Sequence, residues 1–249
     1  MKIIYKFIGF LIVFLPETSI GQENISVVVT SSWTAAYAEL AGIDSYSVMA
    51  PFEMQHPSEY ELQIEDIKRL READLIICGG YESMMNKIRT GLQIDPERIL
   101  EIKTDYNLDN ITRSVHSIAK IAGTSNKAEK NLQHISDLFI ESREKIENAG
   151  LRETPVLAQF FLRSLSEELK LNIAGIFGPR QLEAFDIGEL MQIDFKMIID
   201  NAHNPSAKPL AESKKGAEIV YLINFPGVGG TRTLEDVIRY NVNMLLKNR

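Results

Sequence analysis

The sequence predicts an α/β fold with two parallel-sheet lobes joined by one long helix. In both halves of the chain, short apolar runs alternate with helical segments, as in βαβ units with parallel strands. Between the halves, residues 126–149 form one uninterrupted helical pattern. We therefore expect a lobe over residues 22–122, a linking helix within 123–150 and a second lobe over 151–249.

The individual elements follow from apolar runs and from glycines at their ends. In the N-terminal half, the expected strands are 25–30, 46–49, 74–78 and 99–102, and the expected helices are 34–41, 65–73, 81–89 and 110–122. In the C-terminal half, the expected strands are 156–158, 173–177, 195–200 and 219–223, and the expected helices are 162–169, 205–215 and 234–246. Gly42, Gly79 and Gly123 stand directly after such segments, which is typical of element termini.

The linking helix is predicted from periodic apolar residues. Residues at spacings of three, four and seven share one helix face, and here they are Leu132, Ile135, Leu138, Phe139 and Ile146. Ser125 is expected to cap the start of this helix, and Gly150 to end it. At about 1.5 Å per residue, the helix would be roughly 35 Å long, which is enough to span two lobes.

Residues 1–21 have the three parts of a cleavable secretory signal. Lys2 and Lys6 precede or flank a short apolar stretch, and the segment ends in the small-residue pattern Ser19-Ile20-Gly21. An uncleaved membrane anchor is the alternative, but a span needs about 20 apolar residues, and Lys6 and Pro16 bracket fewer. The single cysteine, Cys78, is far from the exit of this signal, so no lipid anchor is expected. We expect a periplasmic protein with no direct membrane anchor.

The net charge and the cysteine content of the chain limit the kinds of partner and of covalent cross-link that we expect. The formal charge is −7, and residues 1–21 contribute +1, so the exported part carries about −8. This acidic balance argues against nucleic acid or an anionic membrane as a partner. One cysteine excludes an intrachain disulfide, and its position in the apolar run 75–78 favours a core role.

Polar side chains follow several predicted strands, at the sheet edge where ligands gather in parallel α/β folds. His56 lies in the loop after the second strand, and Gln159 directly follows the fifth. Asp200 closes a later strand, and His203 stands three residues beyond it. Two imidazoles and a carboxylate from different loops form a plausible mixed nitrogen and oxygen site for a divalent metal. The predicted metal ligands are His56, Asp200 and His203, with Gln159 as a weak fourth ligand or a hydrogen-bond donor behind them.

Each candidate also fits a structural role. A histidine in a loop is commonly a surface or hydrogen-bonding residue. Asp200 could cap the helix expected after Pro205, and Gln159 could be an ordinary amide side chain in a loop. Glu82 fits a first helical turn, where the helix dipole favours a carboxylate. Glu82 and Trp33 are otherwise candidates for supporting or gating the site.

Motifs for catalysis are weak. The glycine-rich segment 227–232 lacks the Gly-Lys-Ser/Thr ending of a phosphate-binding loop. The sequence contains neither Gly-x-Ser-x-Gly nor His-Glu-x-x-His. His116 and His134 lie within helical patterns and are expected on helix faces. We therefore predict that the protein is not an enzyme.

Two segments carry a family resemblance. The first is His56-Pro57-Ser58-Glu59-Tyr60-Glu61-Leu62, followed by Asp66-Ile67 and Ala73-Asp74-Leu75-Ile76. The second is the closing segment Leu234-Glu235-Asp236-Val237-Ile238-Arg239-Tyr240-Asn241. With them, nearly the whole exported chain resembles the cluster A-I solute-binding proteins, the periplasmic metal-binding proteins of zinc and manganese ABC transporters.

The resemblance implies two α/β lobes joined by one long helix, a divalent metal as cargo, and delivery by a monomer to an inner-membrane ABC permease. It also implies four ligand positions, of which Gln159 and Asp200 match the third and fourth. Ser58 stands where the first ligand histidine is normal, with His56 two residues earlier, and Asn107 is nearest to the second. Zinc is favoured, but with fewer imidazoles and more oxygen ligands the selectivity could move to manganese or iron.

Two alternatives remain open from the sequence. The same fold could bind an organic solute or a metal chelate in place of a metal ion. A periplasmic hydrolase would use Asp200 and His203 as an acid-base pair, although the sequence shows no nucleophile for it.

Overall fold

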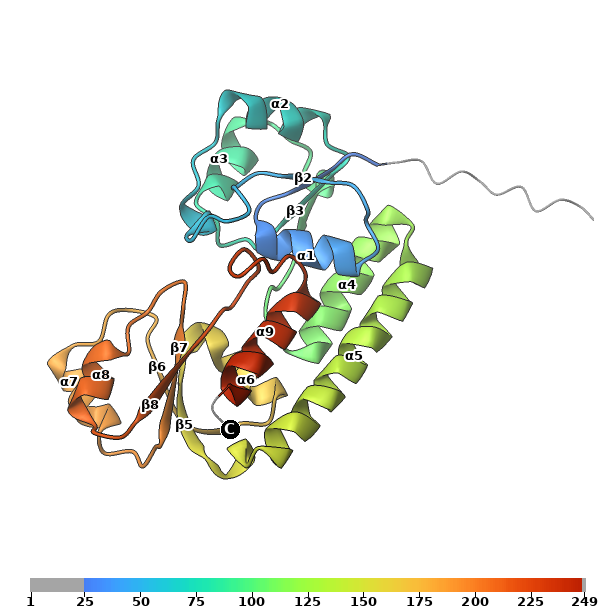
Figure 1. Ribbon diagram of the computed structural model, residues 1–249. Helices are drawn as coiled ribbons and strands as arrows, with labels where there is room; N and C mark the ends of the chain where they lie inside the picture. The colour runs from blue at the N-terminus through green and yellow to red at the C-terminus, as the bar shows by residue number, and fades with distance from the viewer. Residues whose placement is uncertain (1–24, 248–249) are drawn as a thin grey trace, which may run out of the picture.

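The computed structural model describes residues 25–247, which form two four-stranded sheets with helices around them (Figure 1). The predicted signal peptide lies outside these residues. All strands in both sheets are parallel. The first sheet has the order β2-β1-β3-β4, with β1 (Val27–Val29), β2 (Ser47–Val48), β3 (Leu75–Cys78) and β4 (Ile99–Glu101). The second has the order β6-β5-β7-β8, with β5 (Pro155–Gln159), β6 (Asn172–Phe177), β7 (Met197–Asn201) and β8 (Glu218–Leu222).

The helices connect and cover these strands. Around the first sheet they are α1 (Ser32–Leu40), α2 (Ile64–Glu72), α3 (Met84–Gly91) and α4 (Leu108–Ala122). The 24-residue α5 (Ser125–Asn148) leads to the second half, which contains α6 (Arg163–Glu168), α7 (Ala184–Leu190), α8 (Lys208–Ser213) and α9 (Leu234–Leu246). Within the described residues there are also four short 3-10 helices: η1 (Pro57–Glu59), η2 (Pro96–Arg98), η3 (Leu151–Glu153) and η4 (Phe160–Leu162). The predicted fold class is confirmed.

Both faces of the first sheet are buried, which explains its continuous apolar strands. Val27 and Val29 face the core shared with α1 and α4, whereas Val28 points to the opposite face. There, it joins a cluster with α2 and α3 that includes Leu70 and Cys78. The core role expected for Cys78 is therefore confirmed.

The second sheet is covered in the same way. Leu157 and Ile198 pack with α7 and α8, and Val156 and Ile199 point into the larger core. That core continues through α5 and α9, so one apolar region extends from one lobe to the other. In Figure 1, α4, α5 and α9 lie beside one another along one side of the molecule. Because α9 also packs against α1, the last helix of the chain contacts the first lobe, and the predicted lobe boundaries stay predictions.

Several details differ from the sequence expectations. The N-cap residue of α5 is Thr124 and not Ser125, because Ser125 already lies within the helix. The helix α7 was not expected, because its seven residues are few for a helical pattern and Gly188 interrupts them. The third helix begins at Met84 and not at Tyr81, because residues before it form a turn in which Gly79 N donates to the Glu82 carboxylate.

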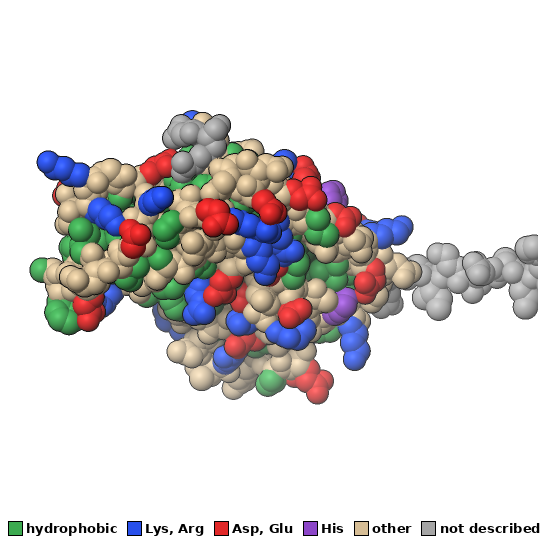
Figure 2. Space-filling model, turned by 90° about the horizontal axis from the view of Figure 1, so that it is seen from below, with side chains coloured by type: hydrophobic (Ala, Val, Ile, Leu, Met, Phe, Trp, Pro, Cys, Tyr) green, Lys and Arg blue, Asp and Glu red, His purple; other side chains and the backbone are tan. Residues whose placement is uncertain are grey.

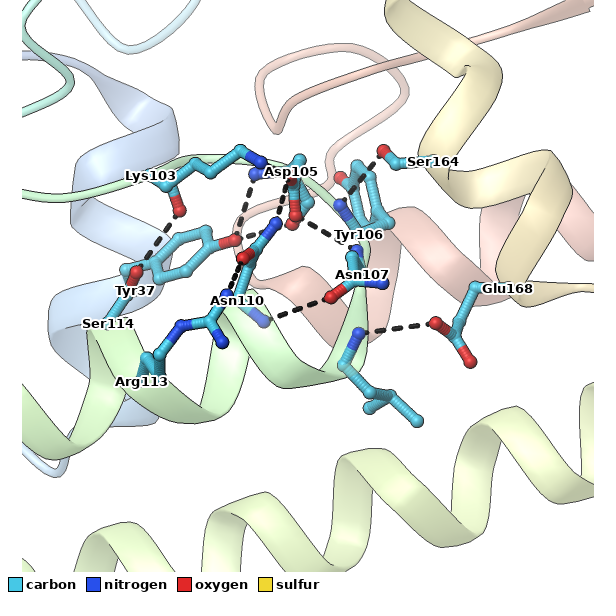
Figure 3. Close-up of polar contacts among 11 residues, drawn as sticks. Tyr37, Lys103, Asp105, Tyr106, Asn107, Asn110, Arg113, Ser114, Ser164 and Glu168 are labelled. Atoms are coloured by element: carbon cyan, nitrogen blue, oxygen red, sulfur yellow. Dashed lines mark hydrogen bonds and ion pairs between the residues drawn. The ribbon is translucent and has the colours of Figure 1, made fainter.

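The segment between β4 and α4 is hydrogen-bonded to the second lobe (Figure 3). Tyr106 N donates to Ser164 Oγ at 3.1 Å, and Leu108 N donates to Glu168 Oε2 at 3.2 Å. Glu168 also forms an ion pair with Arg143 of α5. These contacts join residues of both lobes close to the linking helix.

The surface carries both signs of charge. On the face in Figure 2, acidic and basic side chains are interspersed, without a large area of one sign. Within residues 25–247, no helix is long and apolar enough to cross a membrane.

A buried asparagine connects α9 to the end of β8. Ile223 N donates to Asn241 Oδ1 at 2.9 Å, and Asn241 Nδ2 donates to Ile223 O at 2.7 Å. The side chain of Asn241 is fully buried. We expect Asn241→Ala to lower the free energy of unfolding by about 2–4 kcal/mol, because two buried backbone groups lose their partners.

Urea unfolding followed by circular dichroism measures this loss. The matched control is Asn243→Ala, an exposed position of the same helix, which should change stability by less than about 0.5 kcal/mol. Equal losses for both variants would contradict the role assigned to Asn241.

Candidate functional site

A cleft of about 540 Å³ lies between the two lobes, next to the carboxyl ends of the strands. Its lining in the first lobe includes Trp33, His56, Ser58, Glu59, Tyr81 and Thr104. Its lining in the second lobe includes Phe161, Asn201, His203, Asn204, Asn224 and Phe225. This is the position at which parallel α/β sheets bind ligands, because the loops that leave the strands meet there.

His56 reaches the cleft from the loop after β2. It directly precedes η1, whose start is set by Pro57, and its side chain is exposed. The neighbouring Gln55 donates from Nε2 to the backbone oxygen of His203 at 3.1 Å. This hydrogen bond crosses the cleft and connects the loops that carry the two histidines.

His203 lines the cleft from the opposite lobe and is only 4% exposed. Its ring stacks on Phe225, with centroids 3.7 Å apart, and its Nδ1 lies 2.9 Å from Asn224 Oδ1. Because an amide oxygen only accepts, Nδ1 carries the proton and Nε2 carries the lone pair. Nε2 has no hydrogen-bond partner among the described residues.

Burial sets the charge of this imidazole. Desolvation by burial lowers the pKa of His203 from 6.5 to about 4, and repulsion from His56 lowers it slightly further. The hydrogen bond with Asn224 has a smaller effect in the opposite direction. The ring is therefore neutral near pH 7. A neutral imidazole with a free Nε2 lone pair is the form that binds a metal.

Trp33 lines the cleft from the first turn of α1. Its ring lies between Tyr106 and Phe225, with centroid distances of 6.2 and 5.9 Å. The side chain is 8% exposed, and its Nε1 has no hydrogen-bond partner within residues 25–247. Trp33 therefore provides an aromatic wall and an unpaired donor.

Asp200 has a structural position behind the cleft. Its carboxylate accepts hydrogen bonds from the backbone N–H groups of Asn201, Ser206 and Ala207 at 2.9–3.0 Å. Burial raises its pKa, and these hydrogen bonds oppose the rise. Asp200 does not line the cleft, and it holds the turn that carries His203. Its role as a metal ligand stays a prediction.

Gln159 and Glu82 are also buried behind the lining. Gln159 Oε1 accepts from Phe161 N at 2.7 Å, so it caps the start of η4. Glu82 accepts from Thr30 Oγ1 and from Gly79 N, so it connects the ends of β1 and β3. A ligand role for Gln159 and a gating role for Glu82 stay predictions.

Ser58 and Asn107, the residues nearest to the first two ligand positions of the family, lie in different places relative to the cleft. Ser58 lines the cleft beside His56. Asn107 does not line it, because its side chain caps α4 by accepting from Asn110 N at 3.1 Å. Lys103 and Thr104, which follow β4, are the residues of this segment that line the cleft.

Asn224 and Phe225 belong to the cleft but were not among the sequence candidates. Both residues follow β8 closely, and this position after a strand was the one sequence feature that indicated a place near the site. Both side chains are uncharged and neither is an imidazole, so the sequence holds no further mark of a ligand-binding role.

Charged groups are few in the cleft. Within the described lining, Glu59 is the only carboxylate and Lys103 the only lysine or arginine. No group of three or more His, Cys, Asp or Glu side chains in residues 25–247 is placed to hold a metal ion. The cleft therefore combines two imidazoles with amides, hydroxyls and aromatic rings.

Solved structures of other proteins share this fold. The Mn-bound periplasmic metal binding protein from Candidatus Liberibacter asiaticus has a TM-score of 0.65 at 16% identity, over 90% of this chain and 98% of that chain. The laminin binding protein Lmb of Streptococcus agalactiae, described as bifunctional with adhesin and metal transporting activity, has a TM-score of 0.68 at 16% identity, over 90% and 98%. No family model matches the sequence, and no curated protein shows significant similarity to it. The two-lobed fold implied by the resemblance is confirmed.

The low pKa of His203 predicts a pH-dependent stability. Below its ordinary pKa of 6.5, the unfolded state binds a proton that the folded state takes up only near pH 4. Stability therefore falls as the pH falls through this window. Between pH 7 and pH 5 we expect a loss of about 2 kcal/mol from this residue.

Urea unfolding of the metal-free protein at both pH values tests this expectation. His203→Gln, which cannot titrate, should remove most of this pH dependence, whereas His116→Gln at an exposed position of α4 should retain it. An equal loss in wild type and His203→Gln would show that another group is responsible.

Proposed function

We propose that this chain is a divergent cluster A-I solute-binding protein of the periplasm, which captures a divalent metal in the interlobe cleft. It would deliver this cargo to an inner-membrane ABC permease. The observation that carries the proposal is that His56 and His203, from different lobes, line the same cleft. A ligand between two lobes contacts both at once, as expected for a binding protein of this architecture.

The surroundings of His203 support a coordinating role. Histidine ligands usually donate their second ring N–H to an oxygen, which fixes the tautomer and the ring orientation. Asn224 Oδ1 provides this acceptor at 2.9 Å, and Phe225 fixes the ring plane by stacking. The free Nε2 is thereby held in one orientation before any cargo arrives.

The donor set favours zinc, with manganese or iron as alternatives. Imidazole nitrogen suits zinc, iron and related metals, whereas carboxylate and amide oxygens suit manganese. Glu59, Asn201 and Asn204 bring such oxygens to the same cleft. The structural neighbours, described as Mn-bound and Cd-bound metal binding proteins, support a divalent metal as the cargo.

A binding role is also better supported than catalysis. An acid-base pair of Asp200 and His203 requires their side chains to interact. In the structure, Asp200 accepts from backbone N–H groups, and the imidazole pairs with Asn224 instead. The hydrolase alternative therefore has no geometric support in this part of the chain.

Metal titration tests the proposal. We expect purified, metal-free protein to bind zinc, or manganese or iron, with a micromolar or lower dissociation constant by calorimetry. His56→Ala combined with His203→Ala should weaken binding about 100-fold or more, because both nitrogen ligands are lost.

The chain offers a matched control in its other two histidines. His116→Ala combined with His134→Ala removes the same number of imidazoles from exposed helix positions and should leave metal affinity unchanged. Absence of binding tighter than micromolar in the wild type, or an equal loss in the control, would overturn the proposed metal site.

A further inference from the structure

We infer that the cargo is a neutral complex of a divalent metal with a flat aromatic chelator, and not a bare metal ion. This inference rests on the proposed function and specifies the cargo of the same cleft. Its basis is the combination of cleft size, missing negative charge, aromatic walls and two unpaired nitrogen atoms.

The cleft is large for an ion. Its volume is about 540 Å³. One water occupies about 30 Å³ of liquid, so a metal ion with six waters needs roughly 200 Å³. Sites for organic ligands usually measure about 300–1,000 Å³. The cleft is therefore large enough for a small organic ligand together with a metal ion bound to it.

The cleft also supplies too little negative charge for a bare dication. Glu59 provides the one carboxylate among the described lining residues, and Lys103 of the same lining forms its ion pair with Asp105 at 3.4 Å. The Asp200 oxygens are occupied by three backbone N–H groups behind the cleft. Moving an uncompensated charge out of water is strongly unfavourable. A chelator with its own anionic oxygens would bring the missing charge with the metal.

Aromatic side chains form much of the lining. Trp33 packs next to Phe225, which stacks on His203, so three rings form one continuous wall. Tyr81 and Phe161 add rings that are 49% and 40% exposed. Flat aromatic ligands gain both buried apolar area and ring contacts from such surroundings.

Two residues of this wall carry a buried nitrogen atom without a hydrogen-bond partner, and such a ligand could supply both partners. Trp33 Nε1 is a donor and His203 Nε2 an acceptor, and neither has a hydrogen-bond partner among residues 25–247. An anionic oxygen of the chelator would accept from Trp33. The metal, with a free coordination position, would bind His203 Nε2. The exposed His56 provides the second imidazole from the other lobe.

The test compares three probes: zinc ion alone, pyridine-2,6-dicarboxylate alone, and their neutral 1:1 complex. The dicarboxylate is planar and aromatic, and its zinc complex keeps free coordination positions. Trp33 is the only tryptophan of the chain, so its fluorescence reports occupation of the cleft directly. Calorimetry provides the affinities independently. We expect the complex to bind at least tenfold more tightly than either component.

Variants identify the atoms involved. His203→Gln keeps a side chain of similar size but removes the imidazole, and it should weaken binding of the complex at least tenfold. Trp33→Phe, measured by calorimetry, keeps an aromatic wall but removes the donor and should weaken it severalfold. His116→Ala should bind like the wild type. Thermal unfolding of each variant verifies that it is folded.

Each other outcome overturns the inference in a distinguishable way. If free zinc binds as tightly as the complex, a bare ion is the cargo, and the proposed metal-binding function stands. If the dicarboxylate alone binds as tightly as the complex, the metal is not recognised, and an organic solute replaces it. If no probe binds, both the inference and the proposed function are wrong.

Discussion

The geometry of the cleft depends on the buried carboxylate of Asp200. It accepts hydrogen bonds from the backbone N–H groups of Asn201, Ser206 and Ala207, so the chain after β7 turns around it. His203 lies inside this turn, where its own N–H donates to Asn201 Oδ1. Each buried N–H left unpaired would cost about 1–3 kcal/mol. The carboxylate therefore orients the imidazole without touching it, and the negative charge that a metal would use is committed to the backbone.

The two lobes are held together by more than the linking helix. Gln55 donates across the cleft to the backbone of His203, and Ser32 Oγ donates to Pro226 O at 2.8 Å. The contacts in Figure 3 add a second attachment near α5. Because both walls are fixed by such contacts, a ligand meets a cleft that is already formed. Preorganisation of this kind reduces the ordering cost of binding and makes fit to the existing shape decisive.

Much of the fold could be predicted because strands and helices differ in apolar period. The last helix was predicted with its observed ends, 234–246, whereas α7 escaped because Gly188 interrupts a very short segment. The candidate site was harder to predict than the fold. A place after a strand indicates the sheet edge at which a residue lies, but not the direction of its side chain. His203 therefore lines the cleft as expected, whereas Asp200 turns inward to the backbone, and the neutral Asn224 carries no sequence signature of a ligand-binding role.

The unpaired nitrogens of Trp33 and His203 both belong to residues that line the cleft. Buried polar atoms are normally hydrogen-bonded, and leaving one unpaired costs about 1–3 kcal/mol. Two such atoms on one wall represent a sizeable part of the 5–15 kcal/mol that typically stabilises a protein. Folding tolerates this cost where a ligand later relieves it, and a ligand that pairs both atoms recovers the cost as affinity. A bare ion relieves only the lone pair of His203, since the indole N–H repels a cation and requires an acceptor. The pair of atoms thus selects a cargo that presents a metal and an anionic oxygen together.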